Sequence, residues 1–285
     1  MIINRYFSRI FLSTNFLKII YKFFAKKFIK LNIFFHYQKI KKISLKKKIN
    51  KKLIDKIYIC HHSPLRHRKL RLKKIVDKFK TKLEWVEGFS PYDIKIDYKK
   101  KLAFEKNKID KSLPGIDQYQ YTYYKNAGRE ITISEYSLFL KMKYCFEDQI
   151  KNQRKIIIIF EDDVILSNEI ENYLNICSFE FKNHIPKLDC LMIGTAFKFK
   201  SKFYNPKKVI HFGKNQLTRC THAMMFSLNA AEKIYKNLNR VNWPIDYKLN
   251  EIIIKESLNV AWSEPGLLQS SLFMESFSSI IKNYN

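Results

Sequence analysis

Three consecutive acidic residues, Glu161, Asp162 and Asp163, form the most chemically suggestive pattern in this sequence. They directly follow residues 156–160, five large apolar residues in a row, which is typical of a strand buried on both faces of a sheet. Carboxylates this close repel one another, and burial raises their pKa values. A divalent cation removes that conflict. The alternatives are a solvated loop or a cluster that caps the following helix.

Carboxylate oxygens suit Mg²⁺ or Mn²⁺, and phosphate oxygens of a ligand typically complete the coordination of such a metal. Glu161 and Asp163 are the expected ligands, with Asp162 in support, because alternate residues at a strand exit point to one face. The metal would neutralise a diphosphate leaving group. The carboxyl ends of strands are also where open α/β sheets bind their ligands.

The elements that must position this cluster follow from apolar runs and helical spacing. Besides the run before Glu161, short apolar runs predict strands at residues 57–60, 82–86, 188–193, 222–226 and 260–262. Helical spacing predicts helices over 65–79, 135–150, 230–238 and 244–256, and one more between the acidic cluster and residue 188. The strand–helix–strand opening indicates a mostly parallel sheet of the α/β class.

Polar segments and helix caps complete this outline. Thr132 or Ser134 is expected to cap the helix over 135–150. Asn229 is expected to cap the helix over 230–238. Residues 95–128 are interpreted as a long insert or mobile loop, and residues 200–217 as irregular. There is no internal repeat.

The charge distribution separates the N-terminal segment from the rest of the chain. The net charge is +28 over 285 residues, and residues 1–56 alone hold 16 Lys or Arg against one acid, Asp55. We therefore expect two parts: an N-terminal extension over residues 1–52 and a domain over residues 53–285. The extension is expected to be either a basic amphipathic helix on an anionic membrane or a disordered leader. Its lysines interrupt any stretch that could cross a bilayer, and no cleavable signal is expected.

Five cysteines, an odd number without a Cys-x-x-Cys pair, argue against a disulfide framework or a zinc site. Free, mostly buried thiols in a reducing compartment are the expectation. We therefore predict a cytoplasmic protein, with peripheral contact to a membrane through its basic N-terminus.

A series of short segments also resembles, in order, the motifs of glycosyltransferase family 25, which includes lipopolysaccharide sugar transferases and collagen galactosyltransferases. The segment over residues 157–164, with the acidic triplet, carries the strongest resemblance. The others are residues 58–68, 131–141, 189–194, 218–223, 244–246, 264–269 and 278–280. Met142 departs from the pattern, because members of the family usually have a His there.

The resemblance implies a GT-A fold, which is a Rossmann-like α/β/α sandwich with a mostly parallel central sheet and one nucleotide site. It implies metal-dependent, inverting transfer of a hexose from a nucleoside-diphosphate sugar, with Mn²⁺ or Mg²⁺ and a UDP-hexose as the expected donor. The acceptor would be a glycan, a glycolipid or a protein. The resemblance covers roughly residues 57–281 and leaves the first 50 residues without a counterpart.

Such a transfer needs a general base near the acceptor hydroxyl, and Asp246, Glu264 and Glu135 are the candidates. Asp246 could equally begin a helix and favour its dipole. Arg219 could pair with the diphosphate. Arg68 could contact a phosphate, although either arginine could also be an ordinary surface residue.

Three histidines fit the site less well. His61 and His62 could line the nucleotide pocket beside the first strand, but no third ligand supports a metal there. His222 is more often a structural histidine than a base.

Other classes of protein remain open. The basic leader and the tyrosine-rich residues 119–124 could serve a nucleic-acid-binding protein, although no recognised module for that function is present. A metal-dependent nuclease could also use clustered acids, but a second acidic motif with a nearby lysine is missing. The Met142 departure leaves room for an inactive transferase-like binding protein.

Overall fold

The computed structural model describes residues 31–94, 132–195, 205–212 and 217–270, apart from residues 32, 48, 50–52, 186, 206–207, 219, 240 and 242. The described ranges hold a seven-stranded sheet with the order β2-β1-β3-β6-β4-β7-β5. Its strands are β1 Lys56–Cys60, β2 Leu83–Val86, β3 Ile156–Glu161, β4 Cys190–Thr195, β5 Ile210–Phe212, β6 Ala223–Ser227 and β7 Val260–Leu268.

Five strands of this sheet run in one direction, and β5 and β6 run against them. This confirms the predicted α/β fold with a mostly parallel sheet. The reversed β6 lies in the middle, between β3 and β4. Residues 200–217 were predicted to be irregular, which is wrong for β5. This strand pairs only with β7 among the named strands. Its three residues are too few to show an alternation of apolar and polar side chains.

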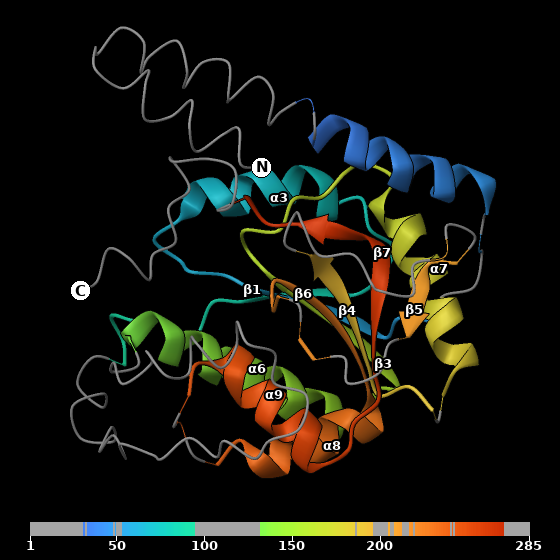
Figure 1. Ribbon diagram of the computed structural model, residues 1–285. Helices are drawn as coiled ribbons and strands as arrows, with labels where there is room; N and C mark the ends of the chain where they lie inside the picture. Colours follow the sequence, from blue (N-terminus) through green and yellow to red (C-terminus); the bar gives the residue numbers. More distant parts are fainter. Residues whose placement is uncertain are drawn as a thin grey trace, which may run out of the picture.

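Helices cover both faces of the sheet, as Figure 1 shows. The described helices are α3 Arg66–Val76, α6 Ile133–Lys151, α7 Ile170–Asn183, α8 Leu228–Asn237 and α9 Ile245–Lys255, and one over residues 33–46 that we call the N-terminal helix. The N-terminal helix, α3 and α7 share one core with the sheet. Helices α6, α8 and α9 share the core on the other face. Burial on both faces explains why β3 consists almost entirely of isoleucine.

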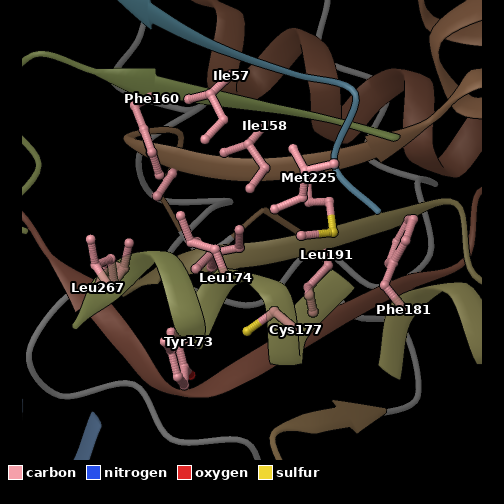
Figure 2. Packing of buried hydrophobic residues seen from close by; sticks show 14 of the residues in the cluster. Ile57, Ile158, Phe160, Tyr173, Leu174, Cys177, Phe181, Leu191, Met225 and Leu267 are labelled. Atoms are coloured by element: carbon pink, nitrogen blue, oxygen red, sulfur yellow. The ribbon is translucent and has the colours of Figure 1, made fainter. Parts of the chain in front are cut away.

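The core beneath α7 is seen in Figure 2, where Leu174, Cys177 and Phe181 of the helix face apolar side chains of the strands. All five cysteines are free, and four are buried. The expectation of free, mostly buried thiols is therefore confirmed. None of the helices within the described ranges is both long and apolar enough to cross a bilayer.

The caps explain where two helices begin. Thr132 caps α6 in a capping box, because its side chain accepts from Glu135 N at 3.3 Å and Glu135 Oε2 accepts from Thr132 N at 2.9 Å. The expectation that Asn229 caps α8 is wrong. The chain passes from β6 directly into the helix, so Ser227 caps it and accepts from Ala230 N at 3.1 Å, while Asn229 donates to Asp189 Oδ1 at 2.8 Å.

The N-terminal helix packs firmly on the sheet. Its Ile40 is fully buried in the core shared with α3 and α7, and Tyr37 and Ile43 pack against the same core. Residues 1–30, which carry most of the predicted extension, lie outside the described residues, as does the predicted insert over 95–128. The boundary at residue 52 stays a prediction.

Candidate active site

The acidic triplet lies where β3 leaves the sheet between its two neighbours. Glu161 is the last residue of β3, and its Cα partner is Cys60 at the end of parallel β1. Its amide donates to His222 O at 3.0 Å, and the amide of Asp162 donates to Cys60 O at 3.2 Å. The backbone around the triplet is thus fixed by the strands on both sides.

The chain beyond the triplet is pinned to the end of β7. The amide of Ser270 donates to Asp163 O at 2.7 Å, and that of Ile165 donates to Leu268 O at 2.8 Å. A bridge between Val164 and Gln269 lies between these two bonds. The side chain of Gln269 then donates from Nε2 to Asp163 Oδ2 at 2.7 Å. The Asp163 carboxylate is therefore oriented by both backbone and side chain.

Asp162 points to a different environment from its two neighbours. Its Oδ1 accepts from Arg68 Nη1 at 2.7 Å, and its Oδ2 accepts from His62 N at 2.9 Å and lies 2.8 Å from His61 Nδ1. Burial alone would raise the pKa of Asp162, but the His61 hydrogen bond and the Arg68 charge hold it below its ordinary value. Asp162, His61 and Arg68 are each less than a tenth exposed.

This network shows the protein partners of three residues that the sequence placed in the site, whose roles in binding stay predictions. Both carboxylate oxygens of Asp162 are occupied by protein donors, so we assign it to positioning rather than to metal binding. Arg68 is ion-paired with Asp162, and His61 is buried against the same carboxylate. Arg219, the expected diphosphate partner, lies outside the described residues.

Glu161 and Asp163 form an acid pair whose negative charges are poorly compensated. Burial and then the charge of Asp163 raise the pKa of Glu161 to about 8, although a hydrogen bond from Thr221 Oγ1 at 2.7 Å works against the rise. Asp163 is 5% exposed, and its Oδ1 has no hydrogen-bond partner among the described residues. An orphaned buried carboxylate oxygen beside a second carboxylate fits a hard divalent cation such as Mn²⁺ or Mg²⁺.

Asp246 is a further carboxylate near Glu161, because its charge, after those of Asp163 and Asp162, raises the pKa of Glu161. It lies in the first turn of α9, partly buried, and its Oδ1 accepts from Tyr247 N at 3.0 Å. In the described part of the chain, however, no group of three or more His, Cys, Asp or Glu side chains is arranged to hold a metal. The acid pair would therefore need ligand oxygens to complete a metal's coordination.

The other two candidate bases lie in different settings. The Glu135 carboxylate is 6% exposed and accepts from both Thr132 N and Thr132 Oγ1, so it belongs to the cap of α6. Glu264 lies in β7, and its charge helps to raise the pKa of Tyr173 in α7, which places it beside the helical layer. Among the three, we retain Asp246 as the candidate base.

His222 has the structural role that its burial suggests. Its Nε2 lies 2.8 Å from Leu267 O, and its ring fills the space beside Gly194, where an added Cβ would lie 2.8 Å from two ring atoms. It thereby fixes β6 against β4 and β7 just behind the acid pair. Met142, at the position where the family usually has His, is fully buried in the apolar core.

Three residues that contact the acid pair or its neighbours were not singled out from the sequence. Thr221 and Gln269 each bond one acid of the pair, and Lys141 donates to His61 O at 2.8 Å from a buried position. Burial lowers the pKa of Lys141. Burial of His62, and then the charge of Lys141, lowers the pKa of His62 to about 4, so His62 is neutral at pH 7. Lys141 could have been identified from the sequence, because it lies within an otherwise apolar face of its helix.

The sheet and the acid pair at its carboxyl edge define a Rossmann-like α/β enzyme. The family model of Glycosyltransferase family 25 (LPS biosynthesis protein) matches residues 54–249, which is more than half of the chain. The chain belongs to glycosyltransferase family 25, as its motifs indicated. No individual curated protein gives a significant match to it.

Proposed function

We propose that this protein transfers a hexose from a nucleoside-diphosphate sugar to an acceptor hydroxyl, with inversion at the sugar and with a divalent cation bound by Glu161 and Asp163. Membership of glycosyltransferase family 25 supports sugar transfer. The observation that carries the rest is the acid pair, in which the pKa of Glu161 is raised to about 8 and Asp163 Oδ1 is buried without a partner.

When bound, the cation would supply charge neutralisation for the diphosphate as it leaves. The protein's own contribution is to hold two carboxylates in a fixed position at the carboxyl end of β3. Gln269 and the amide of Ser270 hold Asp163, Thr221 holds Glu161, and the buried ion pair of Asp162 with Arg68 fixes the backbone between them. Such preorganised ligands need no rearrangement on binding.

Asp246 is the proposed general base. The acceptor oxygen attacks the anomeric carbon as the bond from that carbon to the diphosphate oxygen breaks, and the electron pair leaves with the diphosphate. The proton of the acceptor hydroxyl passes to the Asp246 carboxylate. A single displacement of this kind inverts the configuration. The support for Asp246 is its position, since its charge acts on Glu161 from the first turn of α9.

The donor half of the proposal is tested by nucleoside diphosphate release from a panel of sugar nucleotides, with and without Mn²⁺. We expect metal-dependent turnover of one donor, and a loss of at least about 100-fold in the Asp163→Asn variant. Asp77→Asn, which alters an exposed acid at the end of α3, is the matched control and should behave as wild type. Absence of both turnover and metal-dependent donor binding would leave an inactive transferase-like protein.

The Asp246→Asn variant tests the acceptor half. We expect its kcat to fall by about 10²–10⁴ while metal-dependent binding of the donor persists, because a base acts on the acceptor. Loss of donor binding instead would assign Asp246 to the metal site. Unchanged kcat would remove it from the reaction and return attention to Glu264.

A further inference from the structure

The N-terminal helix has two apolar faces, and only the inner one is buried. On the inner face Ile40 and Ser44 are nearly inaccessible. On the outer face four large apolar side chains are at least half exposed: Leu31 at 52%, Phe34 at 54%, Phe35 at 57% and Leu45 at 63%. At 3.6 residues per turn, these four fall on one stripe opposite Ile40. We call this stripe the outer apolar stripe.

Lysines surround the outer apolar stripe. Lys39 and Lys46 lie along one flank, Lys41 lies along the other, and Lys42 lies within the stripe. Two acids nearby are already paired, since Glu169, which precedes α7, lies 3.7 Å from Lys41, and Glu180 of α7 lies 3.2 Å from Lys47. Lys39, Lys42 and Lys46 are exposed to solvent. The outer side of this helix is therefore both apolar and cationic.

Helix α3 extends the same surface. It packs on the same face of the sheet as the N-terminal helix, and both appear on that side in Figure 1. Its outer side exposes Leu70 at 62%, together with Arg66, Lys73 and Lys74. Five of the nine large apolar side chains that are exposed in the described ranges thus lie on these two helices. Single exposed apolar residues are ordinary, but a gathering of them marks an interaction surface.

We propose that the outer sides of the N-terminal helix and α3 dock on an anionic membrane surface. An amphipathic helix with Phe and Leu on one stripe and Lys around it is suited to the boundary between headgroups and acyl chains. Anionic lipids attract each lysine near the surface. Residues 1–30 add seven Lys or Arg and no acid immediately before this helix. A second copy of the chain is a poorer occupant, because it would bring like charges together.

The inner face of the docked helix reaches the candidate active site. The Tyr37 hydroxyl donates to Ile165 O and accepts from Leu268 N at 3.3 Å, and His36 Nε2 lies 2.6 Å from Gly266 O. Helix α3 contributes Arg71, whose Nη2 donates to Asp162 O at 3.0 Å and to Val164 O at 3.1 Å. Both docking helices therefore hold the backbone on either side of Asp163.

This contact places the acid pair at a fixed position relative to the membrane. Docking itself is independent of turnover, so its test needs no sugar nucleotide.

The first experiment measures flotation of the full chain with vesicles of phosphatidylcholine, alone or mixed with phosphatidylglycerol. We expect binding to the anionic vesicles that weakens with salt. The variants Phe34→Ser/Phe35→Ser and Lys39→Glu/Lys42→Glu should each bind at least about tenfold more weakly. The matched controls are Tyr92→Ser, which changes an equally exposed aromatic in the loop after β2, and Lys151→Glu/Lys236→Glu, which changes lysines of α6 and α8. Both controls should bind as wild type.

The second experiment separates this surface from the basic residues 1–30. The Phe34→Trp variant should gain fluorescence that is quenched by vesicles with brominated acyl chains, whereas Tyr92→Trp should not. Vesicle binding that persists in both outer-stripe variants, or an unquenched Phe34→Trp, would assign docking to residues 1–30 and overturn the proposal. Self-association that disappears in Phe34→Ser/Phe35→Ser without vesicle binding would identify a second copy as the occupant, and would overturn it equally.

Discussion

Neighbouring acids of the triplet have different environments, and the difference comes from the direction in which each side chain leaves the strand end. Glu161 and Asp163 lie on the side of Thr221, Gln269 and α9. Asp162 points to the opposite side and meets two basic groups that lie 94 and 101 residues away in sequence. Glu161 and Asp163 each accept one side-chain hydrogen bond and leave Asp163 Oδ1 without a partner among the described residues, whereas the buried charge of Asp162 is paired with Arg68 within the protein.

A prediction at this scale is that Asp162→Ala destabilises the fold by about 3–5 kcal/mol, because it leaves Arg68 buried without its carboxylate. Urea denaturation monitored by circular dichroism measures the loss. The double variant Asp162→Ala/Arg68→Leu should recover much of it, since no unpaired charge then remains. A double variant no more stable than the single one would show that the pair is not the source of the loss.

The acidic triplet could be predicted from the sequence as a strand end with carboxylates, but the different partners of its three acids could not. A run of apolar residues followed by acids predicts a strand end with carboxylates. It does not reveal that Arg68 and His61 lie beside the middle acid, because that proximity depends on how β1, α3 and β3 pack together. Asp246 was predicted as a candidate from its place near a helix start, and the effect of its charge on Glu161 could come only from the fold.

At the scale of elements, one ionic network joins β1 to α6. Asp148 of α6 accepts from Lys56 Nζ at 2.9 Å, and it also bonds Tyr58 of β1 and Arg154. Burial would raise the pKa of Asp148, but the Tyr58 and Lys56 hydrogen bonds and the charges of Lys56 and Arg154 outweigh it and lower the pKa. The network holds the helix to the sheet at the end opposite the acid pair.

A pH dependence follows from this lowered pKa. Because folding favours the charged form of Asp148, its contribution is present at neutral pH and is lost as the pH falls below about 4 and through the folded-state pKa. We expect Asp148→Asn to lower the free energy of unfolding by about 2 kcal/mol at pH 7 and by much less near the acid limit of folding. Urea denaturation across this range checks it, with Asp77→Asn as the control. A difference that is constant with pH would contradict the assignment.

Elements with a long apolar run or a clear capping sequence were predicted well. Very short strands and a helix with two apolar faces were not. The five-residue apolar run of β3 and the capping box of α6 can each be predicted from the local sequence alone. β5 has only three residues and is stabilised by β7 rather than by its own pattern. Helix α8 follows β6 without a loop, so the capping residue is the last residue of the strand, Ser227. The N-terminal helix carries two apolar faces, which conceals its inner face from a simple amphipathic pattern.

At the scale of the whole molecule, the fold class was predictable and the strand order was not. Alternating strands and helices indicate an α/β sheet. The reversed β6 pairs with β3 on one side and β4 on the other, and an apolar run gives neither the direction nor the neighbours of a strand. The docking of residues 33–46 likewise depends on the end of β7, more than two hundred residues further along the chain.

The contacts between the N-terminal helix and the end of β7 determine when a growing chain can finish folding. β7 lies between β4 and β5, and its end supplies partners for Tyr37, His36 and Asp163. Translation delivers the N-terminal helix first and β7 more than two hundred residues later, at about 5–20 residues per second. For roughly ten seconds or more, the inner face of that helix therefore lacks the partners of Tyr37 and His36 at the end of β7. The hydrogen bonds that Gln269 and Ser270 make to Asp163 can form only once β7 has left the ribosome.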